Sequence, residues 1–236
     1  MINYGYLQKK LFSVIKYGNN DECIKLLNEG ANANDFLHLK EGTALTFAAS
    51  LGRLEICKIF LNYGAKMEKQ DYYGNNALHN AANKGHINIC EMFLNNGIDV
   101  NIKTKFKSTP LICSITGSYC ENKYYELVKL FIDNNAYIND ADEGYNTALH
   151  WATIKGKIEI CKLLIDNGAD VNNKNIYDEK PIDCTVNKEI IKLLKDKEIE
   201  IENLVHLFKR VPSNYVYSDD SGEESEESED NTDDTK

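Results

Sequence analysis

Cysteine and histidine are the residues of this chain that could form a metal site, a disulfide or a nucleophilic centre. The chain has seven Cys and five His. Four cysteines share one position, seven residues before a glycine, and they are Cys23, Cys57, Cys90 and Cys161. Val128 and Ile191 hold the same position elsewhere. A position that accepts Cys, Val or Ile is a packing position, because a free thiol behaves as a small hydrophobe. We therefore expect these thiols to be buried and without metal.

The spacing and number of the cysteines also argue against disulfides. Equivalent positions in stacked helices lie about 10 Å apart, which is too far for a disulfide. An odd total fits a reducing compartment. Cys113, Cys120 and Cys184 fall outside the shared position, and we expect Cys120 to be the most exposed. No residue near it indicates a catalytic thiol.

The histidines and carboxylates form no pattern typical of catalysis. No two histidines have three or four intervening residues, as metal ligands on one helix would. The chain has no G-x-x-x-x-G-K, G-x-S-x-G or G-x-G-x-x-G motif. The sequence thus predicts no catalytic residue, no cofactor site and no metal site, and we expect a protein that is not an enzyme. Turnover in a metabolite screen would favour the rival hypothesis of an enzyme or enzyme subunit.

The elements that position these residues are repeated helix pairs, clearest at 146–175. Thr147 can cap a first helix with its hydroxyl, and Gly156 ends that helix. A second apolar pattern at helical spacing follows and ends at Gly168. The stretch, NTALHWATIKGKIEICKLLIDNGADVNNKN, resembles the ankyrin repeat, with its T-P-L-H-x-A-A start and G-A-D-V-N end. In that family the motif histidine, here His79 or His150, bonds to backbone or to the cap and ties neighbouring repeats together.

The same unit recurs along most of the chain. Thr43, Asn76 and Thr109 follow one another at steps of 33, and the next step, to Thr147, is 38. The expected segments are an N-terminal capping repeat at 1–34, repeats at 35–197 with an insertion at 116–125, and a shortened last repeat at 178–197. The resemblance implies an all-α solenoid of stacked helix-turn-helix units with β-hairpin-like loops.

The C-terminal region differs from the repeats. Residues 198–212 could form one amphipathic helix. We expect residues 213–236 to be a disordered acidic tail, because from Ser218 onward they hold no apolar residue. Ser221, Ser225 and Ser228 lie beside acidic residues and are possible phosphorylation sites. A purely solubilising tail stays open as the alternative.

Charge limits the class of partner. The formal net charge is −10. Residues 218–236 hold ten acidic residues and one Lys, which leaves 26 basic and 27 acidic residues in 1–217. A body this close to neutral does not attract phosphate backbones, so we expect no nucleic acid partner. No run of about 18 apolar residues is present, so we expect no membrane insertion.

What remains is a surface that could bind protein. In ankyrin proteins the partner usually contacts the loop tips and the first helices. The candidate residues at these places are Tyr72, Tyr73, Asn83, Lys84, Lys103, Lys105, Phe106, Lys107, Asp142, Tyr145, Ile154 and Tyr177. Tyrosines are typical of interfaces, although single exposed aromatics are also normal. For Trp151, binding and packing both stay open.

The sequence therefore predicts an intracellular monomer, cytoplasmic or nuclear, that acts as a scaffold or adaptor for one or more partner proteins. Two alternatives remain. One is a chaperone or assembly factor that uses its acidic tail on a basic client. The other is a substrate adaptor that recruits ubiquitin machinery through residues 198–217, where no clear box motif is present.

Overall fold

The structure is a computed structural model that describes residues 4–38, 42–117 and 122–209. The contacts divide the chain into two units, residues 1–199 and 200–236. The first unit holds the repeats. Of the second unit, only residues 200–209 are described. The predicted acidic tail at 213–236 and its three serines therefore lie outside the described residues.

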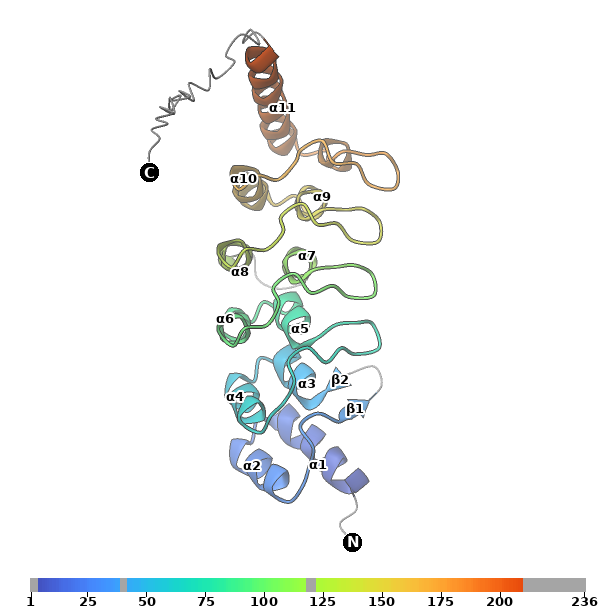
Figure 1. The fold of residues 1–236 in the computed structure, drawn as a ribbon, viewed down its shortest axis with the longest axis vertical. Coiled ribbons are helices and arrows are strands. Elements are labelled where there is room, and N and C mark those ends of the chain that lie inside the picture. Colours follow the sequence, from blue (N-terminus) through green and yellow to red (C-terminus); the bar gives the residue numbers. More distant parts are fainter. Residues whose placement is uncertain (1–3, 39–41, 118–121, 210–236) are drawn as a thin grey trace, which may run out of the picture. The chain divides into compact units, whose positions relative to one another are not determined.

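The described part of the first unit consists of helix pairs joined by short turns (Figure 1). The first helices of the pairs are α1 (Tyr4–Tyr17), α3 (Ala44–Ser50), α5 (Ala77–Asn83), α7 (Pro110–Thr116), α9 (Ala148–Ile154) and the short 3-10 helix η1 (Pro181–Cys184). The second helices are α2 (Asn20–Asn28), α4 (Leu54–Asn62), α6 (Ile87–Asn95), α8 (Asn122–Asp133), α10 (Ile158–Asp166) and α11 (Lys188–Lys209). The strands β1 (Phe36–His38) and β2 (Gly42–Thr43) pair antiparallel in the first long loop.

The helix boundaries follow from the residues at their ends. The Asn76 side chain accepts a hydrogen bond from the amide of His79 at 3.0 Å and so caps α5. Pro110 begins α7, where its missing N–H costs nothing. Gly156 has φ 68, a left-handed conformation that ends α9 without the strain a side chain would meet. These caps and breaks occur where the sequence predicts them.

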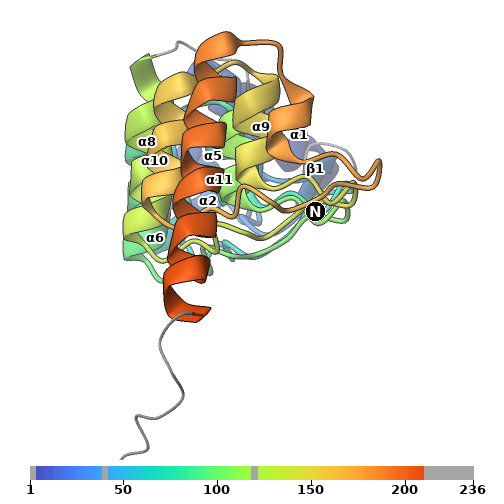
Figure 2. The same cartoon turned by 90° about the horizontal axis from the view of Figure 1, so that it is seen from above.

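Apolar residues at equivalent positions form one continuous core. Each first helix from α1 to α9 contacts the next first helix, and the second helices from α2 to α10 do the same. Phe60, Phe93 and Phe131 are fully buried at one repeated position between these rows. Seen along the stack, the long loops gather on one side, and α6, α8 and α10 lie on the opposite side (Figure 2). The predicted solenoid with hairpin-like loops is confirmed.

The repeated cysteines belong to this core, as predicted. Cys23, Cys57, Cys90 and Cys161 are each 0 % exposed. Burial raises the pKa of the Cys57 thiol to about 12, so the thiol stays protonated at neutral pH. Cys113 is also buried, Cys184 is half-buried, and Cys120 lies outside the described residues.

Two histidines tie one repeat to the next. The Nε2–H of His79 donates to the carbonyls of Ile102 at 3.1 Å and Ser108 at 3.2 Å. The Nε2–H of His150 donates in the same way to the carbonyl of Glu179 at 3.1 Å. Burial lowers the pKa of His79 to about 4, so the ring is neutral at pH 7. The role implied by the ankyrin resemblance is confirmed.

The insertion and the last repeat change the pattern. Helix α8 has 12 residues where α6 and α10 have 9, so part of the predicted insertion extends α8, and residues 118–121 lie outside the described part. Helix α11 runs without a break from Lys188 to Lys209. It includes the end of the shortened last repeat and residues 198–209 of the segment expected to form an amphipathic helix, because good helix-forming residues continue through position 198.

Candidate functional site

The loops that precede the first helices share one five-residue turn. We call these turns the tips; they are residues 71–75, 104–108, 142–146 and 175–179. In each tip the amide of the first residue donates to the carbonyl of the fifth, at 2.8, 3.0, 3.1 and 3.0 Å. The amide of the fourth residue donates back to the carbonyl of the first, at 3.0 Å in all four. The backbone of the tip is thus the same whatever its outer side chains are.

The first side chain of each tip supports the turn from inside. Asp71, Asp142 and Asn175 each accept the amides of the third and fifth tip residues through Oδ1. Thr104 accepts the amide of Ser108 through its hydroxyl at 3.1 Å. These short polar side chains stabilise turns by mimicking backbone acceptors.

The fourth residue of each tip is in the left-handed region, with φ values of 83, 57, 56 and 62 at Gly74, Lys107, Tyr145 and Asp178. At Gly74 space also excludes a side chain, because a Cβ there would come within 2.4 Å of the Lys105 nitrogen. That close approach reflects a hydrogen bond from the amide of Lys105 to the carbonyl of Tyr73 at 3.1 Å.

Equivalent hydrogen bonds join the four tips into a row. The amide of Glu143 donates to the carbonyl of Phe106 at 2.8 Å, and the amide of Ile176 donates to the carbonyl of Gly144 at 3.0 Å. Each of the last three tips is therefore held against the tip before it. The outer side chains stand on a fixed backbone instead of on independent loops.

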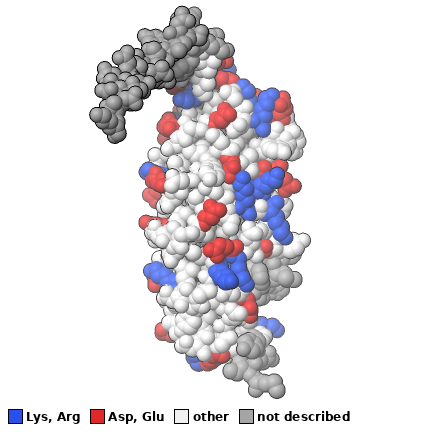
Figure 3. All heavy atoms as spheres, viewed as in Figure 1, with Lys and Arg blue, Asp and Glu red and all other residues white. Residues whose placement is uncertain are grey.

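The outer positions of this row carry large exposed side chains. Six of them are at least 40 % exposed: Tyr72, Tyr73, Phe106, Tyr145, Ile176 and Tyr177. Lysine side chains also gather on the loop side of the stack (Figure 3). We call the six residues together with Lys103, Lys105, Lys107 and Glu143 the tip surface. The structure thus brings most of the predicted site residues into one row.

The lysines of the tip surface already have partners in the loops around the tips. The Nζ of Lys103 lies 2.9 Å from Oδ2 of Asp140. The Nζ of Lys105 lies 4.7 Å from the ring centroid of Tyr72, and the Nζ of Lys107 lies 6.0 Å from that of Tyr145. These cation–π contacts hold the charges over the aromatic rings.

Asp142 does not belong to the exposed surface, although the sequence analysis placed it there. Its side chain is buried. Its Oδ1 accepts two backbone amides, and its Oδ2 accepts the indole N–H of Trp151 at 2.8 Å. Its role is to support the tip and to position Trp151, which is half-buried. Asp71 holds the equivalent position and supports its own tip in the same way, so the alignment of the two residues could have indicated the support of the turn.

Three other predicted residues lie away from the tips. Asn83 ends α5, Lys84 follows it, and Ile154 ends α9. The tips lie before the N-terminal ends of these helices, so about 10 Å of helix separates them from the tip surface. Lys84 and Ile154 are exposed, and Asn83 is half-buried.

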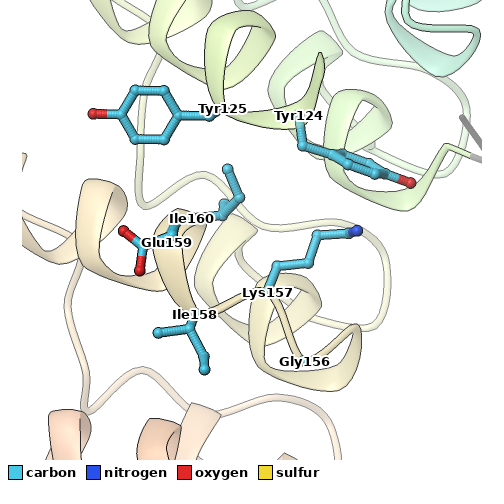
Figure 4. Close-up of a pocket in the computed structure, with 7 residues that line it drawn as sticks. All are labelled: Tyr124, Tyr125, Gly156, Lys157, Ile158, Glu159 and Ile160. Atoms are coloured by element: carbon cyan, nitrogen blue, oxygen red, sulfur yellow. The ribbon is translucent and has the colours of Figure 1, made fainter. Parts of the chain in front are cut away.

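A hollow of about 500 Å³ lies between α8 and the α9–α10 turn (Figure 4). Its aromatic side is Tyr124, whose hydroxyl donates to the carbonyl of Gly117 at 2.7 Å. The Nζ of Lys157 lies 3.4 Å from the Tyr124 ring centroid. The lining residues include no Ser, Cys or His that could act as a nucleophile or base. Within residues 4–38, 42–117 and 122–209, no group of three His, Cys, Asp or Glu could hold a metal ion.

The fold and the tip surface define a repeat protein of stacked helix pairs that presents variable side chains on a uniform row of turns. A family model described as ankyrin repeats (3 copies) matches residues 11–104 and 115–204. The chain belongs to the ankyrin-repeat family. Members of this family generally bind other proteins and typically are not enzymes.

Individual relatives agree with this family. The zebrafish (Danio rerio) neurogenic locus notch homolog protein 1 is 28 % identical over 163 residues, which cover 69 % of this chain and 6 % of that protein. The ankyrin repeat protein OPG189 of variola virus is 26 % identical over 209 residues, covering 84 % and 35 %. The putative ankyrin repeat protein FPV244 of fowlpox virus is 32 % identical over 202 residues, covering 82 % and 29 %. The chain thus spans at most 35 % of the length of these relatives.

No described helix is long and apolar enough to cross a membrane.

Proposed function

We propose that this chain is a non-enzymatic adaptor that binds a partner protein through the tip surface. The observation that supports this most is the row of backbone hydrogen bonds from tip to tip, which holds exposed aromatic side chains in fixed places. A rigid surface binds without a large cost in ordering its loops. Tyrosine and phenylalanine offer a large contact area at a low cost in side-chain entropy.

The proposed partner is a protein, and the proposed state of the chain is a monomer within the cell. Buried thiols at a repeated core position fit a reducing compartment. Asn83, Lys84 and Ile154 form a second, smaller contact at the far ends of the first helices, for a partner large enough to reach both.

The test is a comparison of pull-downs with two matched double variants. Tyr73→Ala with Phe106→Ala removes two rings from the tip surface. Tyr6→Ala with Tyr17→Ala removes two exposed rings from α1. We expect the tip variant to lose the proteins that the unchanged chain retains, and the α1 variant to keep them. Equal retention by both variants would place the binding surface elsewhere.

A third arm tests the alternative of a chaperone for a basic client. Deletion of 218–236 removes most of the negative charge of the chain. If this deletion abolishes binding at low salt while the tip variant retains it, the acidic tail is the binding element and the adaptor proposal fails. The described residues hold no observation that favours the ubiquitin alternative.

A further inference from the structure

A hollow of about 420 Å³ opens on the tip surface, among three successive tips. We call it the notch; its lining residues are Phe106, Ser108, Asp142, Glu143, Gly144 and Ile176. The hydrogen bonds from Glu143 to Phe106 and from Ile176 to Gly144 run between its walls. Its shape is therefore set by backbone contacts and not by a mobile loop.

The notch exists because one tip lacks an aromatic ring. The third residue of the other three tips is Tyr73, Phe106 or Tyr177, and in the tip 142–146 it is Gly144. The missing side chain leaves space between Phe106 and Ile176, which are 52 % and 54 % exposed. The two walls of the notch are thus apolar and open to a side chain from outside.

The notch is acidic between these walls. Glu143 is exposed and has no ion-pair partner within the described part of the chain. The buried carboxylate of Asp142 accepts three N–H groups and faces no lysine or arginine within ion-pair distance among the described residues. The nearby Lys105 and Lys107 lie over the rings of Tyr72 and Tyr145. The negative charge of the notch is therefore available to a ligand.

We propose that the notch binds an arginine side chain of the partner protein, an inference that rests on the proposed function of the tip surface. The planar guanidinium stacks on the Phe106 ring and pairs with the Glu143 carboxylate. The aliphatic stem of the arginine contacts Ile176. Lysine fits less well, because its compact ammonium is more strongly hydrated and cannot stack. An acidic side chain is repelled by Glu143.

The chain contains its own reporter for this site. Trp151 is its one tryptophan, and its indole N–H donates to Asp142 at the base of the notch at 2.8 Å. Charge entering the notch changes the field at this hydrogen bond. The indole N–H signal in a ¹H–¹⁵N NMR spectrum of the labelled full chain therefore measures occupancy of the notch without a known partner.

The experiment titrates the chain with N-acetyl-arginine amide, N-acetyl-lysine amide and N-acetyl-citrulline amide. Citrulline keeps the shape of arginine without its charge. We expect a saturable shift of the indole signal with arginine, a smaller shift with lysine and none with citrulline. Glu143→Gln should abolish the arginine response. The matched variant Glu91→Gln, which changes an exposed acid on α6, should retain it.

Two results would overturn the inference: an equal response to citrulline and arginine, or an arginine response that Glu143→Gln leaves unchanged. The absence of any response up to the solubility limit of the arginine probe would do so too. These outcomes are independent of the pull-down with the tip variants. The tip surface can bind a protein that presents no arginine, in which case the proposed function stands and this inference fails.

Discussion

The four tips share one backbone conformation, but two kinds of side chain support them. We call these the histidine anchor and the aspartate anchor. The tips 104–108 and 175–179 each receive a hydrogen bond from a histidine of the preceding repeat, His79 or His150, to the carbonyl of the fifth residue. The tips 71–75 and 142–146 receive none, because the preceding repeats have Thr46 and Ile112 at the histidine position. Those two tips begin with aspartate.

Within each tip, the residues that support the turn are different from the residues that face a partner. The two histidines and three of the first tip residues, Thr104, Asp142 and Asn175, are buried, and Asp71 is half-buried; they hold the turns. The second and third tip residues face outward and vary from aromatic to basic to acidic. A repeat protein can therefore change its binding surface without changing its scaffold. The predictions that follow disturb the core, one histidine anchor and one aspartate anchor in turn.

The largest expected effect comes from the core that carries all tips. Leu164 is fully buried in α10, and Leu164→Ala should lower the free energy of unfolding by about 2–5 kcal/mol. Urea denaturation followed by circular dichroism measures this. The exposed Lys162→Ala, on the same helix, is the control and should change stability by about 0.5 kcal/mol or less. Equal effects would mean that α10 does not pack into the core.

The second prediction concerns pH and the histidine anchor. The folded pKa of His79, about 4, lies below its ordinary value of 6.5. As pH falls through 6.5 the unfolded chain binds a proton that the folded chain does not. The contribution of His79 to the free energy of unfolding is therefore fully present above pH 6.5. It is lost as pH falls to 4, by about 3 kcal/mol in total. The pKa of His150 is lowered in the same direction.

The measurement is the free energy of unfolding from about pH 7.5 to 5.5, above the range in which most carboxylates titrate. In His79→Thr this position has the residue type of Thr46, which holds it in the preceding repeat. The variant should reduce the slope of the free energy of unfolding against pH. Amide hydrogen exchange should then be faster in the tip 104–108 and unchanged in 142–146, which has no histidine anchor. An unchanged slope, or equal acceleration in both tips, would contradict the division of the tips into two kinds.

Sequence periodicity was enough to predict the stack, since glycines, caps and apolar positions recur at fixed steps. It could not predict that α11 continues through position 198. Apolar periodicity shows which residues face the core, but it does not show whether two neighbouring helical segments are joined. Asp142 shares the first tip position with Asp71, so its support of the turn could be predicted from the sequence, whereas its burial could not. The notch was not predictable, because it depends on which outer side chains from three tips surround the missing ring at Gly144.

The smallest effect is expected from one oxygen of the aspartate anchor. Asp142→Asn keeps the Oδ1 that accepts the two tip amides, as Asn175 does in its own tip. It replaces Oδ2 by an amide nitrogen, so the indole N–H of Trp151 loses its acceptor. We expect a loss of about 1 kcal/mol and a changed Trp151 fluorescence spectrum, whereas Asp142→Ala should cost about 1–3 kcal/mol, because the turn amides lose their acceptor too. Denaturation of the two variants, followed by that fluorescence, ranks them. Equal losses would show that the Trp151 bond, and not the turn, accounts for the contribution of Asp142.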